Sequence, residues 1–502
     1  MRRFITLSFA CTLAFTVLPS AQQGAPKAAA DALGVASIKT LQFTGSGRNF
    51  SVGQNFTPNE AWPPVTVKSY TAMINYDTVS MRQDLVREMG TVMPRGGGAP
   101  FTGEQRQNLV VSGNYAWNIV PPAPAPPGGT APGGGAPQAV PVPGNQADRM
   151  LFVWSTPQGF VKAAMANNAT TKKAKGGTEV SFTVGGKYKM TGIIDAQNHV
   201  ERVQTWIDQP IVGDMLVETV YSGYKDFGGV QFPSHIVQSQ DGFPSLDLTV
   251  SSVTVNQPVD ITAPDNVRNA PPPPPAPVTA NKLADGVFYL TGGTHHSLAI
   301  EMKDHIVLVD TPLTEARALA VIAKAKESIP GKPIRYVVTS HHHWDHLGGI
   351  RAAMDEGATI VTHQSNEAFL KRVAKTPHTI NPDRLSASKK PVKIQTVGAK
   401  GTLTDGTRTI ELHLLTNYEH TGDMLVVYLP KEKILGEPDA FTALPTPTST
   451  LVVTAVPYAA ALYDNIQRLH LDVQTIAPFH GARTTDVAEL AKAAGKSAAR
   501  TN

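Results

Sequence analysis

A proline-rich segment in the middle of the chain separates two regions with different hydrophobic patterns. Residues 263–280, APDNVRNAPPPPPAPVTA, include five consecutive prolines, which favour an extended and semi-rigid backbone. Before this segment, apolar and polar residues alternate with a period of two, whereas after it short apolar runs alternate with helical patterns. A chain of 502 residues is long enough for two or three domains. We therefore expect a domain of residues 27–262, a linker of residues 263–280 and a second domain of residues 281–495.

The first domain is expected to be a mostly antiparallel β-sheet with one or two helices. In SLDLTVSSVTV, Leu246, Leu248 and Val250 would share one face of a strand. The segment TEVSFTVGGKYKMTGII predicts a hairpin that turns at its Gly-Gly pair. A Pro/Gly-rich stretch of residues 120–145 lacks the side chains that form a core, so we expect a disordered insertion there.

The start of the chain has the pattern of a secretory signal. Arg2 and Arg3 precede an apolar run of residues 4–18, which is followed by small and polar residues. That run is too short to span a membrane, and no other stretch is long and apolar enough. The single cysteine, Cys11, lies inside it, so the mature chain would carry no thiol. We expect a signal peptide of residues 1–21 and a periplasmic or secreted protein.

The charge of the chain argues against nucleic acid as a partner. The 44 basic and 40 acidic residues leave a net charge of only +4, and no block of basic residues is present. We expect a small-molecule substrate instead, and nothing in the sequence sets an oligomeric state.

The second domain is expected to be a layered α/β domain. The strand-like segments HIVLVDTP, PIRYVVTS and TIVTH alternate with the helix-like segments LTEARALAVIAKAKESIPG and IRAAMDEG. Further strands are predicted at TIELHLLT, MLVVYLP, KILGE and TIAPFH, with a helix at AALYDNIQRLH. Such alternation is typical of sheets that are covered by helices.

The segment VVTSHHHWDHLGG gathers four histidines and an aspartate at the end of a predicted buried strand. Residues two apart in an extended segment share a face, so His341 and His343 can converge on one metal ion. Asp345 and His346, at the turn into the next helix, can reach a second ion. Imidazole combined with a carboxylate suits zinc, with iron and manganese as alternatives.

Three further metal-binding residues are predicted at strand edges. His420 stands just before a strand, while Asp439 and His480 each follow one. Ligands of α/β sheets bind where strands end at their carboxyl side. Seven candidate ligands at such positions favour a metal site over a solvated polar loop.

The motifs HHHWDH, EHTGD, GEPDAF and PFHG resemble, in this order, those of the metallo-β-lactamase fold hydrolase superfamily, over residues 283–490. The resemblance implies an αββα sandwich with two metal ions at one edge. It also implies an aspartate that bridges the two ions, as in glyoxalase II-type members. Position by position, the first ion would be held by His341, His343 and His420, the second by Asp345, His346 and His480, and the bridge would be Asp439.

Two positions depart from the family pattern. Asn417, Tyr418 and Glu419 stand before His420 where the family often has Pro-Gly. A proline precedes the bridging aspartate where a glycine is usual, which leaves Glu437 as the alternative bridge. Without a mature cysteine, the lactamase subclass that uses a cysteine ligand is excluded.

This resemblance implies a binuclear hydrolase. Two divalent ions about 3.5–4 Å apart share a water and lower its pKa toward about 7. The resulting metal-bridged hydroxide would attack the carbonyl of an ester, thioester, lactone or lactam. Asp345 would hold the second ion and orient the nucleophile. The alternative is an envelope binding protein whose N-terminal sheet holds an apolar partner, with the hydrolase fold as a scaffold.

Several nearby polar residues are given weaker roles. His295 and His296, in GGTHHSL, are expected in a turn, with contact to substrate as the alternative. Asp310 closes the strand IVLVD and is expected to cap or brace the site. Thr421 and Asp423 are expected either to support ligand imidazoles or to be ordinary polar groups of a turn.

Overall fold

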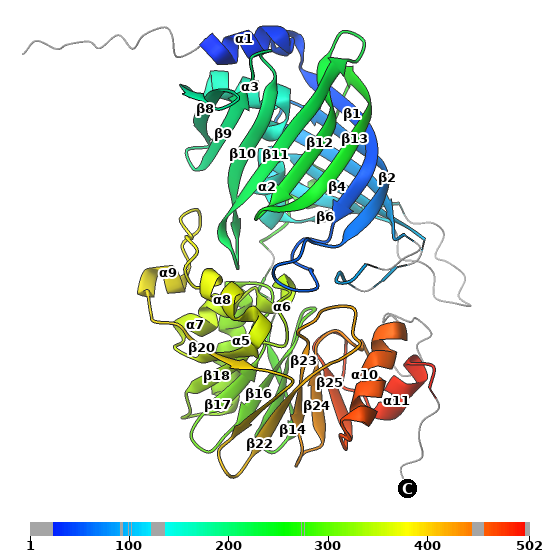
Figure 1. Cartoon of the computed structure of the whole chain (residues 1–502), viewed down its shortest axis with the longest axis vertical. Helices are drawn as coiled ribbons and strands as arrows, with labels where there is room; N and C mark the ends of the chain where they lie inside the picture. Colours follow the sequence, from blue (N-terminus) through cyan, green and yellow to red (C-terminus); the bar gives the residue numbers. More distant parts are fainter. Residues whose placement is uncertain are drawn as a thin grey trace, which may run out of the picture.

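The computed structural model describes residues 24–90, 94–98, 100–101, 103–121, 136–272, 274–275, 277–443 and 456–496. Figure 1 shows a large curved sheet above a second domain of two smaller sheets and several helices. The expected signal peptide lies outside the described residues, as do residues 122–135 of the expected insertion. Within the described part of the chain, no helix is long and apolar enough to cross a membrane.

The N-terminal domain is one antiparallel sheet of 13 strands, in the order β6-β5-β4-β3-β2-β1-β13-β12-β11-β10-β9-β8-β7. Most neighbours in the sheet are also neighbours in the chain, because short turns connect antiparallel strands. Its strands are β1 (Thr40–Phe50), β2 (Pro64–Asn75), β3 (Ser80–Glu88), β4 (Glu104–Ser112), β5 (Tyr115–Val120), β6 (Gln138–Pro141), β7 (Thr170–Ala174), β8 (Gly177–Val184), β9 (Tyr188–Ile194), β10 (Val200–Gln209), β11 (Gly213–Asp226), β12 (Gln231–Gln240) and β13 (Phe243–Val255).

Three helices accompany this sheet: α1 (Gly24–Ala32), α2 (Gln146–Ser155) and α3 (Pro157–Ala166). Figure 1 places α1 and α3 at the upper end of the sheet and α2 behind its front strands. Buried Leu151 of α2 and Phe160 of α3 belong to the same apolar core as Phe43 and Phe232 of the sheet. The helices thus provide the second layer that a one-sided apolar sheet requires.

The strand and hairpin patterns predicted for this domain are confirmed, although it has at least three helices rather than the one or two expected. Leu246, Leu248 and Val250 are all buried on β13. The hairpin of β8 and β9 turns at Gly185 and Gly186, whose φ angles are 59° and 67°. Positive φ at both central residues is what a tight hairpin turn of this type demands, and glycine adopts it without steric cost.

The structure corrects the expected insertion and linker at their ends. Residues 138–141 are not disordered, because they pair with β5 as strand β6. The start of the linker forms a short helix, α4 (Asp265–Arg268), whose Val267 is buried with Trp117 of β5 and Val110 of β4. Both segments are ordered because apolar residues among their prolines, such as Ala139 and Val267, pack in this small cluster. The composition of the segments did not predict this packing.

The C-terminal domain contains a mixed sheet of seven strands, in chain order β14 to β20, and a second sheet of five strands, β21 to β25. The first has β14 (Thr279–Ala284), β15 (Val287–Thr291), β16 (Ser297–Glu301), β17 (Ile306–Val309), β18 (Ile334–Val338), β19 (Thr359–His363) and β20 (Lys393–Val397). The second has β21 (Lys400–Thr404), β22 (Thr409–Leu414), β23 (Leu425–Leu429), β24 (Ile434–Glu437) and β25 (Thr475–Pro478). The described helices are α5 (Glu315–Ser328), α6 (Trp344–Leu347), α7 (Ile350–Asp355), α8 (Glu367–Val373), α9 (Arg384–Ser388), α10 (Val456–Arg468) and α11 (Val487–Ala493).

The central strands of this domain, such as β17, β23 and β24, are buried on both faces, whereas β14, β20 and β21 at the sheet edges are largely exposed. Val307 of β17 shares a core with Leu412 and Val427 of the other sheet, whereas its neighbour Leu308 belongs to the core that includes Ala318 of α5. On the far side, strands of the second sheet share a third core with α10 and α11. Burial on both faces explains why these strands read as continuous apolar runs in the sequence. The strands and helices that the sequence predicted are present, while β14, β20, β21, α6, α9 and α11 were not anticipated.

The two domains meet through the loop that joins β1 to β2. This β1–β2 loop, residues 51–63, contacts the C-terminal domain through two backbone hydrogen bonds. The Trp344 amide donates to the Gly53 carbonyl across 3.2 Å, and the Gly422 amide donates to the Phe56 carbonyl across 2.9 Å. A separate contact lies elsewhere in the interface, where the Asp214 carboxylate accepts from the amides of Thr379 and Ile380.

Candidate metal centre

The histidine cluster begins where β18 ends and runs into α6. His343 is extended, with φ −61° and ψ 145°, and it directly precedes the helix. The rings of His341 and His343 lie 4.6 Å apart between centroids, and both side chains are fully buried. His342 does not join them, because its Nδ1 lies 2.9 Å from Asp423. The alternation expected for an extended segment is therefore present.

His420 completes a set of three imidazoles with His341 and His343. One nitrogen from each of these residues lies within 4.8 Å of the others. His341 Nε2, His343 Nδ1 and both nitrogens of His420 are buried without a hydrogen-bond partner in the described part of the chain. Buried nitrogens without partners are costly unless something binds them. Neutral imidazoles that share one space fit a transition-metal ion.

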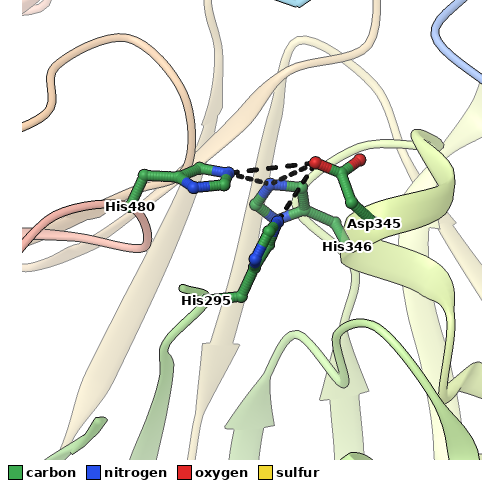
Figure 2. Close-up of side chains that lie close together, drawn as sticks. All are labelled: His295, Asp345, His346 and His480. Carbon is green, nitrogen blue, oxygen red and sulfur yellow. Dashed lines mark hydrogen bonds and ion pairs between the residues drawn. The ribbon is translucent and has the colours of Figure 1, made fainter. Parts of the chain in front are cut away.

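A second set contains the predicted Asp345, His346 and His480, and the structure adds His295. Figure 2 shows the four side chains converging from separate segments of the chain. Asp345 Oδ2 lies 3.1 Å from His295 Nε2 and 3.9 Å from His480 Nε2, while the Nε2 atoms of His346 and His480 are 3.1 Å apart. From the sequence, His295 was expected only in a turn or in contact with substrate, because the isolated β-bridge that joins it to His480 exists only in the folded chain.

Asp439 lies between the two sets. Its Oδ2 is 3.1 Å from His341 Nε2, 3.2 Å from His346 Nε2 and 3.3 Å from His420 Nε2. Its Oδ1 is 2.9 Å from His480 Nε2. This is the position that a bridging carboxylate requires, since it faces members of both sets.

Glu437, the alternative bridge, has a different role. Its Oε2 accepts from the amides of Ala440 at 2.8 Å and Phe441 at 3.2 Å, so it holds the turn that carries Asp439. Burial raises the pKa of Glu437 to about 8.

Asp310, which directly follows β17, supports the histidine segment through hydrogen bonds. Its carboxylate accepts from the Ser340 amide at 2.7 Å, from the Ser340 hydroxyl at 2.6 Å and from His346 Nδ1 at 2.9 Å. These bonds fix the start of the histidine segment and leave Nε2 of His346 free to face Asp439. The bracing role expected for Asp310 is what the structure shows.

Two groups of the β1–β2 loop also touch the predicted ligands. Gln54 Nε2 donates to Asp345 Oδ1 across 2.8 Å, and the Asn55 carbonyl accepts from His343 Nε2 across 2.9 Å. Sequence reasoning missed both, because it found no site chemistry in the N-terminal domain. The segment SVGQNFTPNEAWPP has no metal-binding pattern that could have revealed them.

Thr421 and Asp423 support His342 and the domain interface rather than a predicted ligand. Asp423 accepts from His342 Nδ1 at 2.9 Å and from Asn366 Nδ2 at 2.6 Å, and Thr421 also hydrogen-bonds to it. The expectation that they hold ligand imidazoles is therefore corrected, because the histidine segment turns its middle residue toward them.

The protonation states of the imidazoles suit metal binding. Burial lowers the pKa of His341 and of His343 well below the ordinary value, so both are neutral at pH 7. Burial also lowers the pKa of His346, but Asp439 and Asp310 outweigh it and leave that pKa well above the ordinary value. Nδ1 of His346 faces Asp310, so the additional proton lies on Nε2, which faces Asp439. A metal ion that binds at Nε2 would displace this proton.

The centre is open on one side. The side chains of Asp345 and His480 are 32% and 23% exposed, whereas those of His341 and His343 are buried. A substrate would therefore approach from the side of the second set.

Comparisons with known proteins agree with the resemblance found in the sequence. Residues 290–459 match the family model described as the metallo-beta-lactamase superfamily, so the C-terminal half carries this family's fold. No curated protein matches the chain.

Solved metallo-beta-lactamases are also similar to the chain. One from Pontibacter korlensis is 20% identical, with 43% of this chain and 97% of that one covered, at a TM-score of 0.34. The metallo-beta-lactamase DIM-1 is 22% identical, with 44% and 96% covered, at a TM-score of 0.34. One from Hirschia baltica is 23% identical, with 44% and 97% covered, at a TM-score of 0.33.

Proposed function

We propose that the protein is a binuclear metal-dependent hydrolase, built on the αββα sandwich that its family implies. The observation that carries this proposal is the position of Asp439, whose two oxygens face histidines of both sets. The donor set of imidazoles and carboxylates favours Zn²⁺, with iron and manganese as alternatives. The first ion would be held by His341, His343 and His420, the second by Asp345, His346 and His480, and Asp439 would bridge them.

When bound, two such ions would lower the pKa of a shared water toward about 7 and polarise the carbonyl of the substrate. Residues of the chain would orient the water and the substrate for this chemistry. Asp345 is the partly exposed carboxylate at the open side, so it could orient the attacking water as well as bind an ion. No serine or cysteine nucleophile is required, and the single cysteine, Cys11, lies in the expected signal peptide. The substrate class would be an ester, thioester, lactone or lactam.

We also propose His295 as a further protein ligand of the second ion, beside Asp345, His346, His480 and the bridging Asp439. Its Nε2 lies 3.1 Å from the same Asp345 oxygen that faces His480, and its ring lies 4.0 Å from that of His480 between centroids. His295→Gln should therefore weaken the second ion more than the first. His413→Gln is a matched control, because His413 is also buried and paired with a carboxylate, Glu411, outside the centre.

A different class of function has one supporting observation. A pocket in the N-terminal domain is lined by apolar side chains such as Phe43, Tyr70 and Phe232, which suits an apolar partner in the cell envelope. Under that hypothesis the C-terminal domain would be a scaffold and would need no ions. The secretory signal expected at the start of the sequence suits a periplasmic or secreted location in either case.

Metal content per chain, followed by a panel of hydrolysis assays, separates these two functions. We expect about two equivalents of zinc in the mature protein and chelator-sensitive cleavage of a lactam, thioester or lactone. Asp345→Ala should bind one ion and lose nearly all hydrolysis. A protein that binds no ion and cleaves none of these substrates would favour the binding module, and an Asp345→Ala variant with two ions and full activity would refute the assignment of Asp345.

A further inference from the structure

The β1–β2 loop of the N-terminal domain touches one predicted ligand from each set. Gln54 donates to Asp345 Oδ1, and the Asn55 carbonyl accepts from His343 Nε2. In both cases the loop binds the ligand atom that faces away from the centre. Asp345 Oδ2 remains directed at His295 and His480, and His343 Nδ1 remains without a partner.

The loop is held rigidly enough to position another side chain. The Gln54 carbonyl accepts from the Gly97 amide across 2.7 Å, and Asn55 Nδ2 donates to the Glu60 carbonyl across 3.0 Å. Trp62 packs edge-on against Trp344, with 5.6 Å between ring centroids, directly beside the histidine segment. Contacts on both domains therefore fix the direction in which Gln54 points.

Two other predicted ligands, His346 and His341, have their outer partners inside the C-terminal domain. His346 donates to Asp310, and His341 Nδ1 lies 3.0 Å from the Ser340 hydroxyl. Such partners set the orientation and tautomer of metal ligands. Asp345 differs, because its outer oxygen is bound by a residue 291 positions earlier in the chain. Without that bond the Asp345 carboxylate, whose side chain is 32% exposed, could rotate away from the imidazoles.

We propose that Gln54 is a positioning residue for Asp345, so that the N-terminal domain is part of the metal centre. The amide of Gln54 fixes the plane of the carboxylate and directs Oδ2 toward the second ion. The Asn55 carbonyl on His343 anchors the loop to the same segment. This inference rests on the proposed binuclear centre and assigns to the N-terminal domain a task in it.

The test is a titration of the full-length protein with Co²⁺, followed by visible absorption and by the number of ions retained. His420→Ala removes a ligand of the first site and gives the spectrum of the second site alone. His480→Ala removes a ligand of the second site and gives the spectrum of the first. Gln54→Met keeps the length of the side chain but cannot donate. We expect it to weaken the second site about 10–100-fold, the usual cost of losing an outer partner, and to leave the first site unchanged.

Asp214→Asn is the matched control, because it weakens the contact of Asp214 with Thr379 and Ile380 without touching the centre. Both sites should keep their wild-type affinity in this variant. If Gln54→Met binds the second ion as tightly as the wild type, the inference is overturned. The proposed function would still be upheld by two ions bound to the wild-type chain. Equal losses in Gln54→Met and Asp214→Asn would also overturn it, since domain docking in general would then be the cause. A wild-type chain that binds no Co²⁺ would overturn both.

Discussion

His346 donates from Nδ1 to the Asp310 carboxylate across 2.9 Å, with both side chains fully buried. The same carboxylate accepts two hydrogen bonds from Ser340, so it fixes the residue before the histidine segment and a predicted ligand within it. Asp310 has a φ of 57°, a left-handed conformation that aspartate and asparagine tolerate better than most residues.

Asp310→Asn should therefore keep the backbone but lose the charge that orients His346. We expect affinity for the second ion to fall about 10–100-fold, as measured by competition with a chelator. Asp304→Asn is the control, because Asp304 pairs with the buried His305 across 2.7 Å outside the centre. An Asp310→Asn variant that holds both ions as tightly as Asp304→Asn does would contradict this role.

The two acidic residues of GEPDAF should respond differently to amide substitution. Asp439→Asn should lower the retention of both ions, though less severely than Asp345→Ala lowers that of the second, because a bridging oxygen loses its charge. Glu437→Gln should retain them, because an amide oxygen can still accept from Ala440 and Phe441. Elemental analysis after gel filtration measures both. Loss of ions in Glu437→Gln alone would identify Glu437 as the bridge.

The β1–β2 loop should be sensitive to a single methyl group at Gly53. This residue has a φ of 75°, and a Cβ there would lie 2.5 Å from the Trp344 ring. Gly53→Ala should lower the free energy of unfolding by about 1–3 kcal/mol through backbone strain alone. The loss should be larger in total, because the loop must also move away from the histidine segment. Gly228→Ala is the control, because its φ is 73° and no atom lies within 4 Å of the added methyl group.

Thermal unfolding and Co²⁺ binding measure the two effects. Both variants should lose stability, but only Gly53→Ala should lose affinity for metal ions as well. Equal metal binding in the two variants would show that the loop can leave its position without disturbing the centre.

Stability should depend on pH through Asp148, far from the centre. Burial raises its pKa from 3.8 to about 6, and the nearby Asp208 adds to the shift. A raised carboxyl pKa means that the folded state favours the protonated form. Ionisation of Asp148 therefore lowers the stability of the folded state progressively as the pH rises from about 4 to above 6. Asp148→Asn should raise stability at pH 7.5 by about 1 kcal/mol, allowing for partial exposure, and change it little at pH 4.

Unfolding midpoints at the two pH values check this prediction, with Asp31→Asn on the exposed side of α1 as control. The same gain at both pH values would show that the substitution acts through packing rather than through charge.

Removal of metal ions should destabilise the C-terminal domain. A ligand at about 1,000 times its dissociation constant stabilises the folded state by about 4 kcal/mol, so a chelator should lower the unfolding midpoint by several degrees. Added Zn²⁺ should restore it, and chelator already saturated with Zn²⁺ should have no effect. A midpoint that does not change with free chelator would argue that the chain binds no ion.

The sequence by itself determined the parts of this protein that depend on local spacing. The two-residue period placed Leu246, Leu248 and Val250 on one buried face, and the His-x-His pattern placed His341 and His343 side by side. Short-range geometry of an extended backbone is sufficient for both. The apolar runs of the second domain likewise predicted its strands, because a strand buried on both faces needs such a run.

Only the tertiary structure decided the contacts that join distant segments. It placed the Asp439 carboxylate among the imidazoles and that of Glu437 against backbone amides, because of the turn that follows β24. It also added His295, which lies just before β16, and Gln54, which reaches Asp345 from another domain. Such contacts depend on how sheets pair and domains dock, so no local pattern in the chain encodes them.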